Sequence, residues 1–336
     1  MGQAVRPPIL VPDEVRDLPI VASVSGGKDS TALTLALLER GLAFRAVFAD
    51  TGWEHEITYQ YLDMLRSKLG ITIDVVKAAP KVDRVASDLT IGLDRSRPMI
   101  DRIVNRAGFP ARMQRWCTVD LKIEPLREYH DRLGEDTVSA VGIRADESES
   151  RKKMPLLEDD SEWGGWVWRP LLNWSVADVL EMHRHYEIPV NPLYQRGHDR
   201  VGCFPCIFAR KEEIRLVAEH SPERISEIRE LEARMTALRA ERNAAVPLTE
   251  CAACKGSGCE ACGGTGTVRV PRYNHNHAAF FQTRLADRYD MGIDEIVTWS
   301  KTAHGGKHLP LLVEPPSGGC FRWGLCEAPK EEPGEG

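Results

Sequence analysis

The chain has 336 residues and a mass of 37.6 kDa, with a formal net charge of −6 and a sequence pI near 6.0. This length suffices for one large domain with an appendage, and the acidic balance argues against a generally basic surface that coats nucleic acid. No apolar run approaches the roughly 18 residues of a membrane span, and residues 1–17 contain no apolar leader. We therefore expect a cytoplasmic protein without a membrane partner, whose contacts with polyanions are local.

The first predicted unit is a strand followed by a helix. Residues 20–24 are short, apolar and β-branched, and apolar residues recur at helical spacing from Ala32 to Leu38. The turn between them reads SGGKDS, in which two glycines allow backbone N–H groups to face a ligand. The helix that follows brings the positive end of its dipole to the same place. The turn therefore predicts an anion site, most simply for phosphate, and a glycine turn capped by Asp29 or Ser30 is the structural alternative.

Strands and helices continue to alternate beyond this unit. The pattern predicts strands at 44–50, at 71–78 and from Thr137, and helices at 55–70 and 175–188. Such alternation predicts an α/β fold with a doubly wound parallel sheet, which binds ligands beyond the carboxyl ends of its strands. The loops that follow residues 24 and 49 should then face one crevice.

The rest of the chain divides by composition. Residues 80–115 are rich in Arg and Asp and are predicted as helical or loop material near the site, whereas residues 210–242 are charged and favour helices broken near Pro222. We predict six parts. An N-terminal extension (1–17) precedes a nucleotide-binding domain (18–208) and a charged helical segment (209–249). A zinc knuckle (250–268), a C-terminal segment that closes a metal or cluster site (269–327) and a disordered tail (328–336) follow.

Five motifs occur in an order that resembles the phosphoadenosine phosphosulfate (PAPS) reductase family of the PP-loop ATP pyrophosphatase superfamily. They are SGGKDS, ADTGWEHEITYQYL, RWCTVDLKIEPL, GIRADESESR, and the long motif that runs from WRPLLNWSVADVL to NPLYQRGHDRVGC. Together they cover most of residues 18–206. The resemblance implies an adenine nucleotide alpha hydrolase-like fold and cleavage of ATP between its α- and β-phosphates.

The resemblance also implies roles for individual residues. The loop would bind the nucleotide phosphates; it consists of Ser25, Gly26, Gly27, Lys28, Asp29 and Ser30. Within it, Asp29 would hold a Mg²⁺ ion and Lys28 would stabilise the departing pyrophosphate. Asp50 and Thr51 would lie along the adenosine part of the nucleotide. Positive charge for anionic oxygens would come from Lys122, Arg144 and Arg151, although each arginine could instead form a surface salt bridge. The candidate catalytic residues are Lys28, Asp29 and Arg144.

Two features differ from the true reductases of that family. Those enzymes carry a degraded phosphate loop, which is intact here, and they end in a tail of the Glu-Cys-Gly-Leu-His type, for which this chain has RWGLCEAP. Both differences favour an enzyme that adenylates a substrate with ATP and then supports sulfur transfer or reduction. Reduction of PAPS or adenosine phosphosulfate to sulfite is one alternative. A nucleotide-sensing module that binds nucleic acid or protein is another.

Nine cysteines in a chain without an export signal indicate metal or redox ligands rather than disulfides. The segment CAACKGSGCEACGGTGT holds two CxxC pairs, whose spacing predicts a closed tetrahedral Zn²⁺ site formed by Cys251, Cys254, Cys259 and Cys262. The segment also resembles a single pair of the CxxCxGxG repeats in the DnaJ-type zinc domain. Such a site would fold an insertion that is too small to have a core of its own.

A second set combines Cys117 with the CxxC pair Cys203 and Cys206, because the family resemblance places all three near one end of the sheet. A fourth ligand would come from Cys320, which we prefer, or from Cys326. Four thiolates could hold a [4Fe–4S] cluster, and zinc is the alternative. A free Cys326 could then carry sulfur or electrons.

The acceptor substrate is left open by the sequence. A sulfonucleotide, tRNA, DNA or a carrier protein all remain compatible with it, with a persulfide carrier as sulfur donor or a thioredoxin-like protein as reductant. One local basic region could bind any of these anions or could pair with nearby aspartates; it comprises Arg95, Arg97, Arg102, Arg106, Arg112 and Arg115.

Overall fold

The computed structural model describes residues 6–81, 87–112, 114–134, 136–160, 165–273, 276–281 and 291–302. Its centre is a six-stranded sheet with the order β3-β2-β1-β4-β6-β5, in which all neighbours are parallel except the antiparallel edge pair β5 and β6. The strands are β1 Ile20–Ser23, β2 Phe44–Ala49, β3 Ile73–Val76, β4 Val138–Ala140, β5 Leu157–Asp160 and β6 Gly165–Trp168. The predicted doubly wound α/β fold is confirmed.

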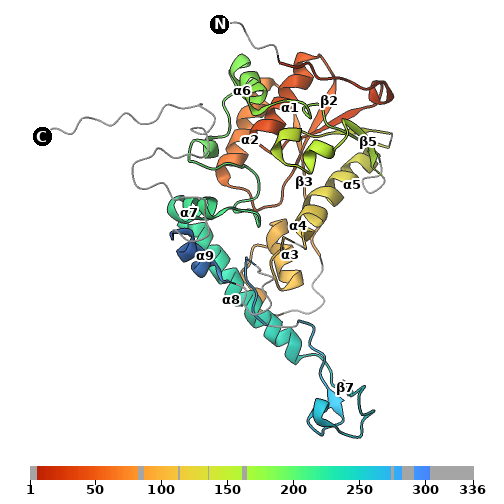
Figure 1. Ribbon diagram of the computed structural model, residues 1–336, viewed down its shortest axis with the longest axis vertical. Helices are drawn as coiled ribbons and strands as arrows, with labels where there is room; N and C mark the ends of the chain where they lie inside the picture. Colours follow the sequence, from red (N-terminus) through yellow and green to blue (C-terminus); the bar gives the residue numbers. More distant parts are fainter. Residues whose placement is uncertain are drawn as a thin grey trace, which may run out of the picture.

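Helices cover both faces of this sheet (Figure 1). Ile20 and Ala22 of β1 share a buried cluster with side chains of α1 Lys28–Glu39, α2 Glu56–Leu69 and α6 Val176–His185. Val21 points to the opposite face, where it packs with Tyr129 of α5 Glu124–Leu133. Because β1 is buried on both faces, it reads as a continuous apolar run rather than as an alternating pattern.

Local sequence signals define the ends of these helices. Nδ1 of His55 accepts a hydrogen bond from the Ile57 N–H at the start of α2, and Gly70 ends the helix in the left-handed conformation, with φ at 62°. Ser175 and Asp178 form a capping box at the start of α6. The predicted helices at 55–70 and 175–188 therefore exist, and the second is shorter than expected at its C-terminal end.

A second, helical part adjoins the sheet. It contains α3 Pro98–Arg106, the short α4 Trp116–Thr118 with a π turn over Val119–Ile123, α7 Lys211–His220, α8 Pro222–Ala244 and α9 Ile293–Ser300. Side chains of α3, α7, α8 and α9 share one buried apolar cluster, whose members include Ile103, Val217, Leu231 and Ile293. None of the helices in the described ranges is long and apolar enough to span a membrane.

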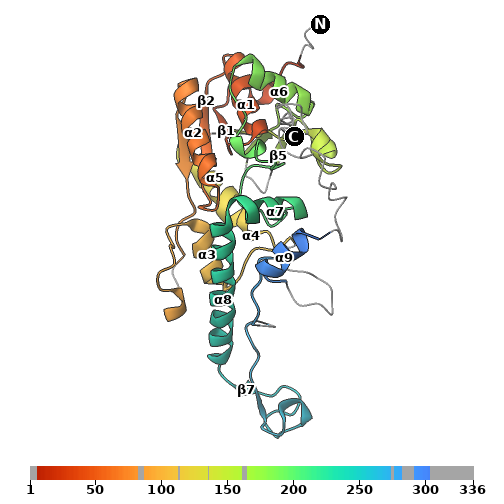
Figure 2. The ribbon, with the colours of Figure 1, turned by 90° about the vertical axis from the view of Figure 1, so that its left-hand side faces the viewer.

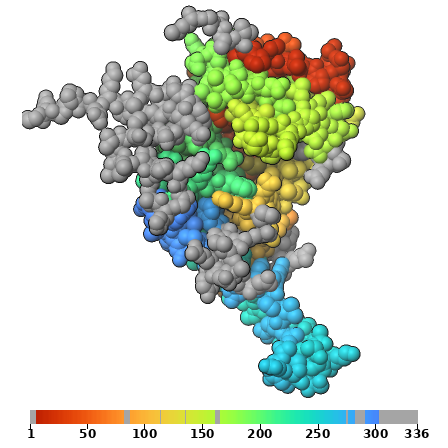
Figure 3. Space-filling view, in the orientation of Figure 1, coloured from red at the N-terminus to blue at the C-terminus, as the bar shows by residue number. Residues whose placement is uncertain are grey.

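Helix α8 extends away from the sheet and carries a small module at its far end (Figures 1 and 2). This module contains the two-stranded pair β7 Thr249–Glu250 and β8 Thr267–Val268. In the space-filling view it forms a separate lobe at the tip of the molecule (Figure 3). The division of the chain into six parts remains a prediction, and residues 303–336, which include Cys320, Cys326 and the tail, lie outside the described residues.

Candidate functional site

The SGGKDS turn joins β1 to α1 at the carboxyl edge of the sheet. Gly26 has a φ of +75°, and a Cβ atom there would lie 2.9 Å from Cγ2 of Thr58, so the position requires glycine. The Oγ of Ser30 accepts a hydrogen bond from the Ser25 N–H and donates one to the Gly27 carbonyl, over 3.1 and 3.0 Å. The loop is thus closed on itself by its own serine, with helix α1 beginning at Lys28.

Two residues from far along the chain hold this loop from outside. The side-chain amide of Asn191 donates to the Gly26 carbonyl over 3.2 Å, and the Tyr194 hydroxyl accepts from the Lys28 N–H over the same distance. Both side chains are buried. The sequence alone predicted no role for Asn191 or Tyr194, although both lie in the NPLY segment of the last motif that resembles the family.

The three candidate catalytic residues meet at the first turn of α1. Arg144 Nε donates to Oδ1 of Asp29 over 2.5 Å, and Lys28 Nζ lies 2.8 Å from Oδ2 of the same carboxylate. Burial by itself raises the pKa of Asp29, but the charges of Lys28 and Arg144 together outweigh it, so the pKa falls below its ordinary value. Asp29 is therefore an anion between two buried cations, and Arg144 also pairs with Asp146.

The loop after β2 lies next to this turn in the sheet. Oδ1 of Asp50 accepts from the Gly52 N–H and from the Tyr59 hydroxyl, each over 2.8 Å, while Oδ2 lies 2.9 Å from Lys77 Nζ. The buried hydroxyl of Thr51 donates to Glu54 over 2.7 Å. Asp50 is therefore held at the strand end expected of it, whereas the hydroxyl of Thr51 points toward Glu54.

Lys122 and Arg151 do not contact the carboxylate of Asp29. The charges that act most on Lys122 are those of Cys203, then Glu54, Cys206 and Cys117, and they raise its pKa to about 12 despite its burial. Arg151 pairs with Glu147 in the segment after β4. Lys122 thus lies near Glu54 and the three cysteines rather than beside the SGGKDS loop.

Three of the four cysteines in the second predicted set lie around one small cavity of about 20 Å³. Cys117, Cys203 and Cys206 line it together with apolar side chains, among them Trp53 and Phe280. The cavity adjoins the loop after β2, because the Phe204 N–H donates to the Trp53 carbonyl over 2.8 Å and the sulfur of Cys203 lies 3.9 Å from the Thr51 hydroxyl. Burial raises the pKa of Cys203 to about 11. The fourth predicted ligand, Cys320, lies outside the described residues.

The predicted basic region divides into two groups. Arg95 and Arg102 pair with Asp101, Arg106 pairs with Asp120, and Arg97 pairs with Glu227, so these four arginines have structural partners. The guanidinium groups of Arg112 and Arg115 instead lie 5.9 and 5.8 Å from the ring centre of Phe208. Of the six arginines, only Arg112 and Arg115 therefore lack a carboxylate partner among the described residues.

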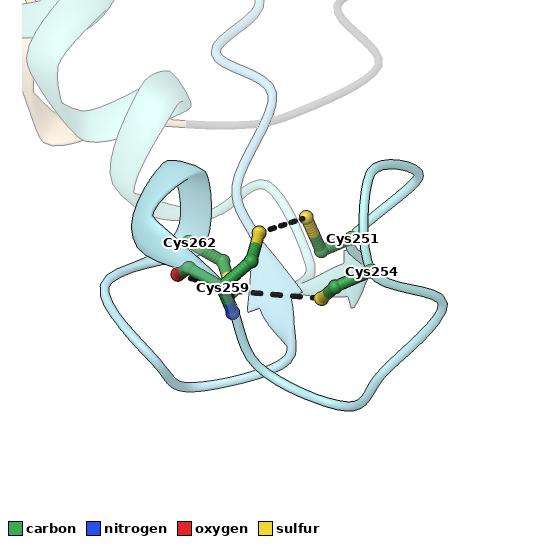
Figure 4. Close-up of side chains that lie close together, drawn as sticks. All are labelled: Cys251, Cys254, Cys259 and Cys262. Atoms are coloured by element: carbon green, nitrogen blue, oxygen red, sulfur yellow. Dashed lines mark hydrogen bonds between the residues drawn. The ribbon is translucent and has the colours of Figure 1, made fainter.

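The four cysteines at the tip of α8 form a compact group (Figure 4). The sulfur–sulfur distance is 3.9 Å between Cys251 and Cys259, and 3.8 Å from Cys262 to both Cys254 and Cys259. Tetrahedral zinc with Zn–S bonds of about 2.3 Å requires edges of about 3.8 Å. Across the described ranges, this is the one group of three or more His, Cys, Asp or Glu ligand atoms that all lie within 4.8 Å of one another.

Backbone amides orient these thiols. The Cys259 and Gly266 N–H groups donate to the sulfur of Cys262, and the Gly258 N–H donates to the sulfur of Cys254, over 3.1 to 3.3 Å. The hydrogen bond from Cys259 is the main reason that the pKa of Cys262 falls to about 6. The spacing of the four sulfur atoms therefore fits a metal ion.

Comparison with protein-family models matches residues 19–209, more than half of the chain, to the phosphoadenosine phosphosulfate reductase domain. The chain belongs to the PAPS reductase family. Its PAPS reductase domain contains the SGGKDS loop, Arg144 and the three described cysteines around the cavity, whereas the four-cysteine module lies outside the matched range.

Individual relatives differ in how much of the chain they share. An uncharacterized 37.8 kDa protein of Escherichia phage 186 is 33% identical over 331 residues, which cover 87% of this chain and 91% of the phage protein. An adenosine 5′-phosphosulfate reductase of Allochromatium vinosum is 30% identical over 188 residues, which cover 56% of this chain and 67% of the reductase. The similarity to the phage protein thus extends beyond the PAPS reductase domain.

Among solved structures, PAPS reductase from Candida auris in a phosphate complex aligns with 58% of this chain and 85% of its own. Its sequence identity is 18% and the TM-score is 0.43.

Proposed function

We propose that the PAPS reductase domain binds ATP with Mg²⁺ at the loop of residues 25–30 and uses it to adenylate a second substrate. A nucleophilic oxygen or nitrogen of the acceptor attacks the α-phosphorus, the bond from that phosphorus to the bridging oxygen breaks, and pyrophosphate leaves. The observation that carries this proposal is the intact loop at the start of α1, in which Lys28 and Arg144 both contact the carboxylate of Asp29.

The charges of the site suit a magnesium triphosphate. Lys28 and Arg144 are buried cations whose shared partner is the carboxylate of Asp29. Asp29 would hold the Mg²⁺ ion that accompanies ATP, and its carboxylate, once neutralised by the metal, would leave Lys28 and Arg144 available for phosphate oxygens. Lys28 and Arg144 would then stabilise the negative charge that develops on the leaving pyrophosphate.

We assign the second stage, sulfur transfer or reduction, to Cys117, Cys203 and Cys206, with Cys320 as the fourth ligand of a [4Fe–4S] cluster. These cysteines share one cavity, yet they do not form a group as tight as the four cysteines at the tip of α8. A single zinc ion needs that tightness, whereas a cluster of four irons is larger and spreads its thiolates. A bound cluster would supply electrons or a site for sulfur.

We assign zinc to the four-cysteine module, because its sulfur spacing matches a tetrahedral site. The seven cysteines in the described ranges form no disulfide, which supports a location in the reducing cytoplasm. A persulfide carrier or a thioredoxin-like protein would be the partner of the second stage.

A second candidate function is favoured by the relatives. Several are named adenosine 5′-phosphosulfate reductases, at 25% to 30% identity. In that case the domain would bind a sulfonucleotide and release sulfite and AMP, with two electrons from a thioredoxin-like dithiol that becomes a disulfide.

Product analysis separates these candidates. Anaerobically purified protein is incubated either with ATP and Mg²⁺ or with adenosine phosphosulfate, PAPS and reduced thioredoxin. The proposal expects pyrophosphate from ATP, with AMP when water is the acceptor, and no sulfite from either sulfonucleotide. Sulfite without pyrophosphate would establish the reductase instead. Nucleotide binding with neither product would point to the third possibility, a nucleotide-sensing module.

A further inference from the structure

We propose that the surface around the cysteine cavity is a binding site for single-stranded nucleic acid, which is the acceptor in the adenylation proposed above. We define the aromatic–arginine rim as Arg112, Arg115, Trp116 and Phe208. The role of the strand as acceptor rests on the proposed function. The binding of the strand does not.

The first observation is positive charge without a compensating carboxylate. Arg112 and Arg115 are exposed, and within the ranges that the structure describes neither forms an ion pair. Their guanidinium groups both lie against the ring of Phe208, at 5.9 and 5.8 Å from its centre. Since the whole chain carries a net charge of −6, binding of a polyanion requires a local concentration of positive charge such as this pair.

The second observation is the presence of aromatic rings among these charges. Phe208 and Trp116 are half-buried, and a third guanidinium, that of Arg106, lies 5.2 Å from the Trp116 ring centre while it also pairs with Asp120. Surfaces that bind single strands combine cations for the phosphates with aromatic rings on which bases stack. The rim supplies both components within two short segments of the chain.

The third observation is that the rim and the cysteines belong to the same segments. Trp116 directly precedes Cys117, and Phe208 follows Cys206 at a distance of two residues, with its N–H donating to the sulfur of Cys206 over 3.5 Å. Cys117 and Cys206 are half-buried, and they pack against the same apolar cluster as Trp116 and Phe208. A ligand seated on the rim therefore lies at the cysteines that we assign to the second stage.

These observations favour nucleic acid over an acidic protein, which would need the charges but not the rings. They also favour a single strand over a duplex. A base that is paired inside a duplex cannot reach the half-buried Cys117 and Cys206, whereas an unpaired base can leave its stack and approach them. The shared chemistry is phosphate with exposed bases, so DNA and RNA both fit, and experiment has to separate them.

The test measures binding by fluorescence anisotropy with labelled 20-nucleotide single strands of DNA and of RNA, and with the matching duplex, over a series of salt concentrations and without ATP. The double variant Arg112→Gln/Arg115→Gln removes the charges of the rim. The double variant Arg16→Gln/Arg40→Gln is the control, since it makes the same change of charge at exposed positions near the start of β1 and at the end of α1, at the opposite edge of the sheet.

We expect the rim variant to bind single strands at least tenfold more weakly, and the slope of log K against log salt to become shallower by about 1.4, the loss of two single-strand phosphate contacts. Phe208→Leu should weaken binding without changing that slope, and the control should bind like the wild type. The DNA and RNA arms then identify the acceptor class by the tighter binding.

The proposal is overturned if the wild type binds neither strand, if the rim variant binds as the wild type does, or if duplex binds as tightly as single strands. Equal competition by poly-glutamate would also overturn it, in favour of an acidic protein partner. Pyrophosphate release from ATP is measured separately on the same samples. The two assays are independent, so a failure of strand binding can be distinguished from a failure of ATP cleavage.

Discussion

The guanidinium of Arg144 donates to the carboxylate of Asp29 across 115 positions of the chain, with Nε and Oδ1 2.5 Å apart. Asp29 lies in the first turn of α1, after β1, and Arg144 follows β4, which is the parallel neighbour of β1. The carboxyl ends of adjacent parallel strands lie side by side, so the sheet itself brings the two residues together. Their contact locates the site at the edge where open α/β sheets bind ligands.

Asp29→Asn should abolish the proposed reaction and destabilise the fold. The change removes the oxygen charge that we assign to Mg²⁺, and it leaves Lys28 and Arg144 buried without a carboxylate between them. We expect pyrophosphate release to fall at least 100-fold and the free energy of unfolding to fall by about 3 kcal/mol, the usual cost of breaking a buried ion pair on one side. Urea unfolding and a pyrophosphate assay measure these effects, with exposed Asp17→Asn as control. Wild-type turnover in Asp29→Asn would contradict the assigned role.

Gly142→Ala should disturb the SGGKDS loop from the segment that follows the neighbouring strand β4. A Cβ at this position would lie 2.8 Å from the Asp29 carbonyl oxygen and 3.1 Å from the Ser30 nitrogen, which are backbone atoms that cannot rotate away. The first turn of α1 must shift, so we expect ATP affinity measured by calorimetry to drop at least tenfold and stability to fall by about 2 kcal/mol. Gly165→Ala is the matched control, because its new Cβ meets nothing closer than 3.7 Å. Equal ATP affinity in the two variants would rule out this effect.

Patterns within short segments predicted the fold well. The apolar run of β1, the helical spacing after it and the glycine turn between them are local signals, and together they indicated a parallel sheet with an anion loop. The four cysteines at the tip of α8 were predicted for the same reason, since their ligand spacing lies within 12 residues of sequence.

Contacts between distant segments were harder to predict. Nothing local shows that Asn191 and Tyr194 hold the Gly26 carbonyl and the Lys28 amide, because those contacts depend on how α6 packs against α1. Lys122 was expected at the phosphates but lies among cysteines, since a positive charge in a motif does not specify its anion. The pairing of Arg97 with Glu227 likewise spans 130 positions.

The second cysteine set should bind iron, and Cys320 should be its fourth ligand. We expect anaerobically purified protein to contain about four irons per chain, with the broad visible absorption of a cluster. Cys203→Ser and Cys320→Ser should each lose most of this iron, while the otherwise equivalent Cys326→Ser should keep it. Metal analysis and visible spectra give the answer. Zinc in place of iron, or an iron content that depends on Cys326 rather than Cys320, would refute the assignment.

The tip module should bind one zinc ion without influence on nucleotide binding. Cys254→Ser removes one ligand of the group, so zinc content should fall by one per chain and hydrogen exchange should accelerate over residues 250–268. ATP affinity should stay unchanged, because the module lies at the far end of α8 from the sheet (Figures 1 and 2). Ser257→Ala, an exposed neighbour within the module, should retain the metal. A loss of ATP binding in Cys254→Ser would show that the two parts are coupled.

Acidification should destabilise the protein through His130. This residue of α5 is buried, with Nδ1 2.5 Å from the Thr137 hydroxyl oxygen, and burial lowers its pKa to about 4, against a smaller opposing effect of Asp131. In the unfolded chain its pKa is about 6.5. Between these values the unfolded state binds the proton more tightly, so the contribution to stability is complete above pH 6.5 and is lost as the pH falls toward 4.

Urea unfolding at pH 7 and pH 5 tests this expectation. His130→Gln should lose less stability than the wild type between the two pH values, by about 2 kcal/mol, which is the linkage expected of such a pKa difference over that interval. Other titrating groups act equally in both proteins and cancel from the comparison. His185→Gln replaces an exposed histidine and should keep the wild-type difference. If His130→Gln and the wild type lose stability in parallel, His130 is not the group that responds to pH.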